Sequence, residues 1–267
     1  ISRGLLVSVK IACVTHTCKI FHLLWFQEID VNRPQLDVPA PGPSFNFAAH
    51  LIARNAQRPG QTAFIDDHES LSYGELTERV ARMARVLLDL GIRREERVLL
   101  LMHDCCDWPV CFLGALYAGI VPVAVNTLLT AEDYAYMLRH SRAQLALVSP
   151  ALVPVLQRAT AQSAHELRAV LVAGADTTAT EGTLALRALL NQAQPLPQCA
   201  DTSPDDPGFW LYSSGSTGKP KGTLHTHANP YWTAELYGRG VLDLRADDVC
   251  FSAAKLFFAY GLGNALS

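Results

Sequence analysis

The apolar residues between positions 72 and 91 recur with the period of a helix. Ser72 and Glu75 have the S-x-x-E spacing, in which each side chain bonds the other residue's free backbone N–H at a helix start. Gly91 can end a helix because glycine readily adopts the left-handed conformation. These signals predict a helix from Ser72 to Gly91 whose apolar positions face a core: Leu76, Val80, Met83, Leu87 and Leu90.

Continuous apolar runs alternate with helical stretches between residues 44 and 173. Runs of four or five apolar residues are typical of strands that are covered on both faces. They occupy residues 98–102, 121–125, 145–148 and 169–173, and helices are expected at about 108–118, from Thr130 onward and at about 153–162. Strands and helices that alternate at this spacing indicate parallel βαβ units. The pattern predicts a three-layered α/β/α fold with a parallel-rich sheet flanked by helices.

The segments on either side of this core have less regular patterns. Residues 1–43 are expected to be a leader separate from the body, because lysines interrupt their apolar part and the stretch 34–43 is rich in proline. Residues 175–206 are polar and proline-rich, and predict a connection with one short helix at about 184–190. The body is expected to span residues 44–267 and to end without a terminating helix.

Composition narrows the class of protein. Of the 267 residues, 49% are apolar and 18% are charged, which excludes a disordered polyelectrolyte. The formal net charge of −3 gives no surplus of positive charge for nucleic acid. Seven cysteines form no dense disulfide framework and predict reduced thiols. The spacing of Cys13, His16, Cys18 and His22 fits no common zinc finger, so no metal site is expected.

A strand-like segment at residues 209–212 runs directly into the sequence SSGSTGKPKG at residues 213–222. Glycines let the backbone approach a ligand closely, and successive N–H groups in such a loop form an anion-binding concavity. Small hydroxyl donors and two cations complete the set: Ser213, Ser214, Ser216, Thr217, Lys219 and Lys221. The combination predicts a loop that binds phosphate groups.

Other interpretations of this loop fit less well. A flexible Gly/Ser linker is disfavoured because an apolar strand fixes one end of the segment. A Walker A motif needs four residues between its glycines and a Ser or Thr after the lysine. Here two residues separate Gly215 from Gly218, and Pro220 follows Lys219. The dinucleotide signature G-x-G-x-x-G is also missing from this loop.

The residues just beyond the loop predict another helix. Asn229 and Pro230 are suited to the N-cap and the first position of a helix that continues through Tyr237. His225 and His227 belong to the residue type that most often transfers protons near neutral pH. Their position beyond the loop favours a structural or indirect role for both.

The stretch from Tyr212 to Gly222, YSSGSTGKPKG, closely resembles the nucleotide-phosphate loop of the adenylate-forming, or AMP-binding, enzymes. Residues 224–238 and 255–264 resemble the benzoate–CoA ligase branch of that superfamily. The resemblance covers residues from about 45 to the end of the chain and implies the layered N-terminal domain of that fold. It also implies ATP, Mg²⁺ and CoA as cosubstrates, an aromatic acid as substrate and a cytoplasmic location, with no membrane or nucleic-acid partner.

In this family a carboxylate attacks the α-phosphate of Mg·ATP, giving an acyl-adenylate and pyrophosphate. The thiol of CoA then attacks the acyl carbon, and AMP leaves. A loop of N–H groups, hydroxyls and lysines would stabilise the charge that builds on the departing pyrophosphate. The resemblance implies that the β- and γ-phosphates are held by Ser213, Ser214, Gly215, Ser216, Thr217, Gly218 and Lys221.

The aromatic segment near the end of the chain has the pattern of a core strand with a turn, or of an apolar slot that accepts a flat ring. In the family this segment lines the acyl pocket, and the resemblance assigns four positions to it: Phe258, Ala259, Tyr260 and Gly261. Many relatives carry His where Phe258 stands. That difference favours a compact aromatic acid over a long fatty acyl chain.

Later motifs of the family, which hold adenine, ribose and Mg²⁺, have no counterpart in the chain. The C-terminal domain with its catalytic lysine also has none. We therefore expect an N-terminal fragment that lacks full CoA-ligase turnover by itself. Two alternatives stay open: a non-catalytic nucleotide- or acyl-binding module, and an adenylation domain that loads a carrier protein.

Overall fold

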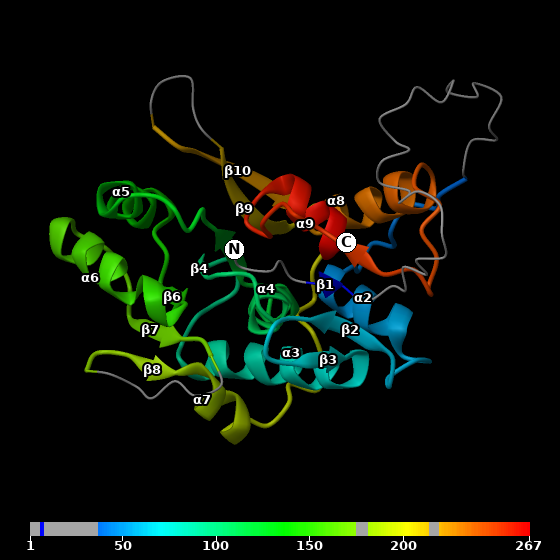
Figure 1. Ribbon diagram of the computed structural model, residues 1–267, viewed down its shortest axis with the longest axis horizontal. Helices are drawn as coiled ribbons and strands as arrows, with labels where there is room; N and C mark the ends of the chain where they lie inside the picture. The colour runs from blue at the N-terminus through cyan, green and yellow to red at the C-terminus, as the bar shows by residue number, and fades with distance from the viewer. Residues whose placement is uncertain (1–5, 8–36, 175–180, 214–218) are drawn as a thin grey trace.

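A large, mostly parallel sheet organises the molecule. The computed structural model describes residues 6–7, 37–174, 181–213 and 219–267 (Figure 1). Within these ranges the large sheet has the order β10-β9-β5-β4-β6-β7-β8, and only its β9–β10 pair is antiparallel. Its strands are β4 (Arg97–Leu101), β5 (Val121–Ala124), β6 (Leu145–Val148), β7 (Ala169–Val172), β8 (Leu184–Ala185), β9 (Pro207–Ser213) and β10 (Lys221–Thr226).

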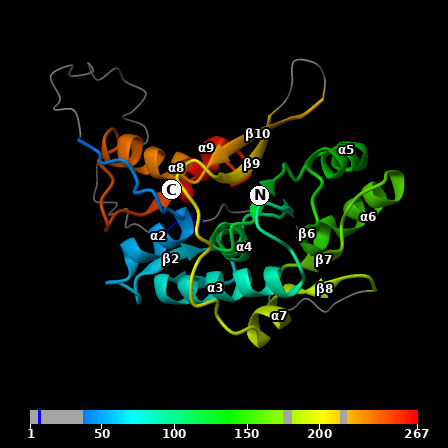
Figure 2. The same ribbon diagram turned by 180° about the vertical axis from the view of Figure 1, so that it is seen from behind.

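Helices cover both faces of this sheet, which confirms the predicted α/β fold. Successive residues of β4 point to opposite faces, so Val98 packs in one apolar cluster and Leu99 in the other. The four central helices are α3 (Tyr73–Asp89), α4 (Asp107–Tyr117), α5 (Ala131–Ser141) and α6 (Val153–Gln162). Helices α3 and α4 contribute to the first cluster, and α5 and α6 contribute to the second (Figures 1 and 2).

Local side-chain signals set the ends of two helices as the sequence predicts. The Ser72 hydroxyl accepts the Glu75 N–H, and the Glu75 carboxylate accepts the Ser72 N–H. Thr130 and Asp133 form the same reciprocal pair at the start of α5. Gly91, which follows the C-cap residue Leu90 of α3, has a φ of 77°. The two ends of α3 and the start of α5 are therefore encoded by residues close in the sequence.

A smaller antiparallel sheet lies beside this core, with the order β11-β1-β2-β3. Its strands are β1 (Leu6–Val7), β2 (Thr62–Ile65), β3 (Ser70–Ser72) and β11 (Cys250–Phe251). Strand β1, which belongs to the predicted leader, pairs with both β2 and β11. Further along, the Tyr231 hydroxyl donates to the carbonyl oxygen of Pro39 at 2.7 Å. The described residues before position 44 therefore contact the body of the molecule.

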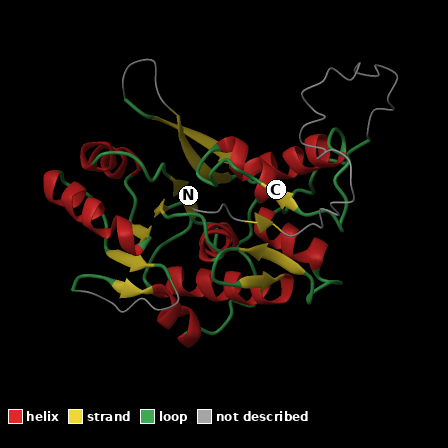
Figure 3. Cartoon of the chain, in the orientation of Figure 1, coloured by secondary structure: helices red, strands yellow, loops and turns green. Residues whose placement is uncertain are grey.

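The remaining elements differ in places from the sequence expectations (Figure 3). They are α2 (Phe47–Asn55), the 3-10 helix η1 (Pro150–Leu152), α7 (Leu186–Gln192), α8 (Ala228–Trp232), the π-helix η2 (Thr233–Arg239) and α9 (Ala259–Ala265). The helix expected at 184–190 begins at Leu186, because the two residues before it pair with β7. No helix in the described ranges is long and apolar enough to cross a membrane.

Helix α9 corrects the expectation of an extended aromatic segment with no helix after it. Its sequence, AYGLGNA, contains two glycines and so has weak intrinsic helix propensity. The helix instead buries Leu262 and Ala265 against the main core cluster. Tertiary packing therefore overrides local preference at this position.

Candidate functional site

A β-hairpin at one edge of the large sheet carries the predicted phosphate-binding segment. Strands β9 and β10 pair antiparallel, with Ser213 opposite Lys221 and Tyr212 opposite Gly222. The sequence predicted β9 but missed β10. Figure 1 shows the hairpin projecting from the sheet near α5. The phosphate-binding signature, residues 212–222, therefore joins two paired strands. The pairing of these strands sets the distance between its two ends.

The predicted phosphate-binding residues fall into two groups. Ser213 and Lys221 are described, and both are exposed at the loop end of the hairpin. The other five lie outside the described residues: Ser214, Gly215, Ser216, Thr217 and Gly218. The hairpin thus brings one hydroxyl and one ammonium group together from opposite strands.

Alternation along the two strands separates the faces of the hairpin. Side chains two residues apart in a strand share a face, and so do directly opposite residues of an antiparallel pair. Ser213 and Lys221 therefore share a face with Leu211 and Phe209. Tyr212 points to the other face, where it meets α5. The two faces of the hairpin consequently have different surroundings.

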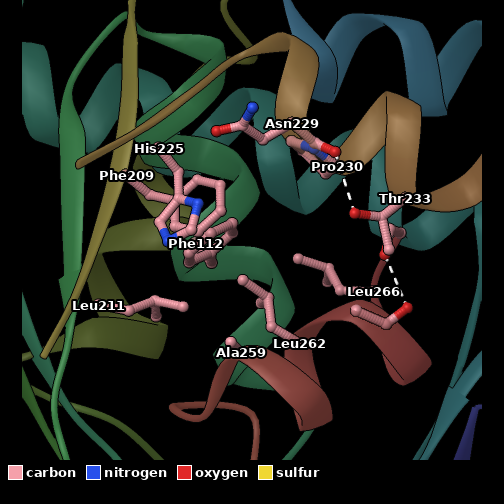
Figure 4. Close-up of a pocket in the computed structure, with 12 residues that line it drawn as sticks. Phe112, Phe209, Leu211, His225, Asn229, Pro230, Thr233, Ala259, Leu262 and Leu266 are labelled. Atoms are coloured by element: carbon pink, nitrogen blue, oxygen red, sulfur yellow. Dashed lines mark hydrogen bonds between the residues drawn. The ribbon is translucent and has the colours of Figure 1, made fainter. Parts of the chain in front are cut away.

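The face that carries Phe209 and Leu211 borders a cavity of about 120 Å³. Figure 4 shows aromatic rings on one side of the cavity and residues of α9 on the other. The cavity is lined by Phe112, Phe209, Leu211, His225, Asn229, Pro230, Thr233, Ala259, Leu262, Gly263, Leu266 and Ser267. Sequence patterns did not identify most of these residues as parts of a site. Phe112, for example, lies almost 100 positions before Phe209 in the chain, and no local pattern links the two.

The rings on the hairpin side of the cavity are stacked. The His225 and Phe209 rings lie 4.7 Å apart between centroids with an interplanar angle of 7°, and Phe112 meets Phe209 edge-on at 5.2 Å. Burial lowers the pKa of His225, and its hydrogen bond with Asn229 acts in the opposite direction. The neutral form of His225 is therefore favoured, and its ring forms part of the cavity wall.

His227 has a structural position, as the sequence favoured. Its side chain is 1% exposed, and its Nδ1 accepts the backbone N–H of Phe47 at 3.3 Å. Desolvation lowers the pKa of His227 to about 4, while Asp206 opposes that shift. The neutral ring therefore ties the start of α8 to the start of α2.

The helix after the hairpin begins slightly earlier than the sequence predicted. Helix α8 starts at Ala228 and follows His227, so Asn229 lies in its first turn rather than at the N-cap. The Asn229 side chain still accepts the backbone N–H of Thr226 at 2.9 Å. The side chain thus satisfies a backbone donor at the junction, although the helix boundary was misplaced.

The four predicted acyl-pocket residues surround the start of α9. Phe258 immediately precedes the helix and is 46% exposed, and Tyr260 is 69% exposed. Ala259 lines the cavity, whereas Phe258, Tyr260 and Gly261 do not. The structure therefore presents two aromatic rings to solvent and places one small residue against the cavity.

Gly261 is buried where no larger residue fits. A Cβ atom at this position would lie 2.1 Å from the carbonyl oxygen of Lys255 and 2.6 Å from that of Ala254. Contacts below 3.0 Å to backbone atoms require the chain to move. The glycine therefore lets α9 lie directly on the preceding loop.

The same loop is tied to the carboxyl end of β4. The backbone N–H of Leu256 donates to Asp104 at 3.2 Å, and the Lys255 ammonium group lies 3.5 Å from the same carboxylate. Burial raises the pKa of Asp104, although the Leu256 N–H and the Lys255 cation both act to lower it. A residue that follows a central strand thereby fixes the loop that leads into Phe258.

One group of potential metal ligands occurs among the described residues: Asp66, Glu69 and Cys106. Glu69 is already bound by the guanidinium groups of Arg79 and Arg187. Asp66 accepts the backbone N–H of Cys106, and burial raises the pKa of the Cys106 thiol. Nearby cations and a disfavoured thiolate make this group unsuited to a metal ion.

Comparisons with known proteins place these features in a family. The chain matches the AMP-binding enzyme family over residues 51–267. It is 48% identical over 236 residues to a benzoate–CoA ligase of Thauera aromatica, covering 87% of this chain and 43% of that relative. A 4-hydroxybenzoate–CoA/benzoate–CoA ligase of Rhodopseudomonas palustris is 46% identical over 224 residues, covering 83% and 41%.

Solved structures give the same result. A benzoate CoA ligase from Burkholderia xenovorans LB400 is 51% identical with a TM-score of 0.76, covering 83% of this chain and 42% of that one. An anthranilate CoA ligase in complex with anthranoyl-AMP is 30% identical with a TM-score of 0.79, covering 85% and 43%. The chain therefore spans less than half the length of each of these relatives.

The family match extends over most of the described fold, and it includes the hairpin and the signature between Tyr212 and Gly222. The layered sheet, the antiparallel edge hairpin and the aromatic segment are parts of one matched region. The chain belongs to the AMP-binding enzyme family.

Proposed function

We propose that the protein containing this chain is an acid–thiol ligase that activates an aromatic carboxylic acid with Mg·ATP. A carboxylate oxygen attacks the α-phosphorus, the bond to the β-phosphate oxygen breaks, and pyrophosphate leaves. The thiol of CoA then attacks the acyl carbon, AMP leaves and the thiol proton is released. Mg²⁺ enters as part of the nucleotide substrate.

The hairpin carries the nucleotide part of this proposal. Ser213 and Lys221 lie opposite each other at its loop end, where they can flank an anion. We assign the β- and γ-phosphates to these two residues and to Ser214, Gly215, Ser216, Thr217 and Gly218. An ammonium group and a row of donors are suited to the charge that develops on departing pyrophosphate.

The proposed binding of the aromatic acid rests on the aromatic segment around α9. We propose that the ring of the acid lies against Phe258, Ala259, Tyr260 and Gly261. Several relatives in the comparisons are ligases of benzoate or its hydroxy derivatives. Rings and small residues at this position suit a flat apolar substrate.

Binding of Mg·ATP to the chain, measured by isothermal titration calorimetry, tests the nucleotide part. Removing the ammonium group with Lys221→Met is expected to weaken binding at least tenfold, because charge-assisted hydrogen bonds contribute about 1.5–3 kcal/mol. Arg139→Gln is the matched control, because it removes one exposed cation from neighbouring α5. A folded wild-type chain that binds no Mg·ATP would contradict the proposal.

A hybrid enzyme tests the acid part. Residues 37–267 would replace the corresponding region of the Thauera aromatica benzoate–CoA ligase, and ATP–pyrophosphate exchange would be measured with a panel of acids. Benzoate, 2-aminobenzoate and 4-hydroxybenzoate are expected to support exchange better than acetate or palmitate. Preference for acetate or palmitate would refute aryl specificity. Mg·ATP binding by the chain without exchange in a folded hybrid would favour a binding module.

We also propose a cytoplasmic location. All five cysteines in the described ranges are free thiols: Cys105, Cys106, Cys111, Cys199 and Cys250. Proteins of oxidising compartments more often pair such residues. Fractionation of the native cells would test this assignment.

A further inference from the structure

The two lysines of the signature have different surroundings. Lys221 lies in β10 opposite Ser213, on the hairpin face that also carries Phe209 and Leu211. The Lys219 ammonium group instead lies 5.6 Å from the ring centroid of Tyr136 on α5. An ammonium group at that distance from an aromatic face is attracted by the ring's electron density.

The Tyr136 ring belongs to a connected set of aromatic side chains. It stacks on His140, one turn further along α5, with centroids 5.5 Å apart and an interplanar angle of 20°. The His140 ring meets Tyr212 at 5.7 Å, and its Nδ1 lies 2.8 Å from the Tyr212 hydroxyl. Trp210 approaches the same imidazole at 6.0 Å. Helix α5 thereby contacts β9 through Trp210 and Tyr212, two alternate residues of that strand.

The second strand of the hairpin also packs closely against this set. A Cβ atom at Gly222 would lie 3.3 Å from a ring carbon of Trp210 and 3.4 Å from a ring carbon of His140. The backbone of β10 therefore lies close to these rings. Both strands of the hairpin therefore lie against the His140 ring of α5.

We propose that Tyr136, His140, Trp210 and Tyr212 form an aromatic clamp that holds both ends of the phosphate-binding signature. In this clamp Lys219 is a positioning residue: its ammonium group rests on Tyr136 and does not bind phosphate. Lys221, on the other face, is the signature lysine that does. The inference deepens the proposed function and rests on it.

A double-mutant cycle separates these two roles for Lys219. The affinity for Mg·ATP is measured by calorimetry for wild type, Tyr136→Leu, Lys219→Met and the double variant. A cation–π contact at an exposed site corresponds to a two- to five-fold change in affinity. Each single change is expected to weaken binding by about that factor, and the double variant should bind no more weakly than either single one.

Conservative variants show whether the ring and the charge carry the effect. Tyr136→Phe keeps the ring, and Lys219→Arg keeps a cation that can rest on it, so both should retain wild-type affinity. Arg139→Gln controls for loss of an exposed positive charge on α5, because Arg139 bonds Ser163 and not the clamp. Thermal unfolding of every variant identifies a general loss of structure.

Nuclear magnetic resonance tests the contact without nucleotide. The chain has only five lysines, so their ε-CH₂ signals can be assigned by single substitutions. The Lys219 signal is expected to shift upfield because of the ring current in wild type and Tyr136→Phe. In Tyr136→Leu this shift should disappear.

The outcomes distinguish the clamp from the proposed function. If wild type binds Mg·ATP and the single effects multiply in the double variant, Lys219 acts independently of Tyr136 and the clamp assignment is wrong. The assignment also fails if the Lys219 signal lacks the upfield shift. If folded wild type binds no Mg·ATP, the nucleotide function fails, and the positioning role fails with it.

Discussion

The edge hairpin and the aromatic segment around α9 are both proposed to contact substrate, yet they are positioned in different ways. In the hairpin, alternation and register place Ser213 and Lys221 opposite each other. In the aromatic segment, Gly261 lies on the Lys255 carbonyl and Asp104 holds the Leu256 N–H. Strand pairing therefore positions the hairpin. Contacts with backbone atoms and with residues distant in the sequence position the aromatic segment. Substitutions in the aromatic segment should be less tolerated.

The largest effect is expected for Gly261→Ala. The new Cβ would meet the Lys255 carbonyl oxygen at 2.1 Å, so either α9 or its preceding loop must move. We expect a loss of about 3 kcal/mol in the free energy of unfolding, the upper end of the usual cost of overpacking, despite alanine's better helix propensity. Urea denaturation measures this change.

Gly263→Ala is the matched control in the same helix. Its Cβ would lie 3.3 Å from the Thr233 methyl group, which is the end of a side chain that can move. A change within about 1 kcal/mol is expected there. Equal losses at both positions would show that close approach at Gly261 is not the cause.

The next largest effect concerns pH and His227, at the junction between the hairpin and α8. Its pKa is lowered to about 4 in the folded chain, so the folded state binds fewer protons than the unfolded state between pH 6.5 and 4. Stability is therefore full above about pH 6.5 and falls as pH drops toward 4. The slope is at most about 1.4 kcal/mol per pH unit, for a total of about 2 to 3 kcal/mol.

His227→Asn tests the assignment of this slope. Its side-chain oxygen can accept the Phe47 N–H but does not titrate, so the stability profile should flatten between pH 6.5 and 4. Burial also lowers the pKa of His50 and His225, and a shallower slope should remain. Urea denaturation at several pH values measures this slope. An unchanged slope in the variant would argue against His227 as the source.

A smaller effect is expected for Asp104→Leu, which removes the tie to the aromatic segment. The Leu256 N–H would lose its acceptor, at a cost of about 1–3 kcal/mol. Asp104→Asn keeps an acceptor oxygen and should recover most of that stability. Equal stability of the Leu and Asn variants would show that this hydrogen bond contributes little.

The smallest effect is expected in the hairpin, for Tyr212→Phe. The variant keeps the ring but loses the hydroxyl that contacts His140, a change of about 0.5–1.5 kcal/mol. Hydrogen exchange at the β9 and β10 amides is expected to quicken, while exchange in α9 stays unchanged. Faster exchange in α9 as well would show that the two regions are coupled.

The sequence predicted what short-range patterns encode. The capping pairs and the apolar strands follow from residues a few positions apart, and the apolar run 209–212 marks β9. Strand β10 was missed because its first four residues are exposed, and two of them are Lys221 and Gly222. An edge strand with one partner has no apolar run to reveal it.

Long-range contacts were beyond sequence patterns. Tyr136 and His140 are one turn apart and share a helix face, but nothing local indicates that Trp210 and Tyr212 pack there. Helix α9 was missed because its two glycines argue against a helix, whereas burial of Leu262 favours it. The resemblance supplied the phosphate-loop assignment, and the comparisons supply the family.

The sheet order has a consequence for how the chain folds. Strands β4 to β7 follow one another with short connections, but more than eighty residues separate β5 from its other neighbour, β9. Closing so long a loop delays that pairing, so we expect the substrate-binding hairpin to join the sheet late in folding. Until then the edge of Val121–Ala124 is uncovered, and refolding at high concentration should produce aggregates that begin by pairing along it.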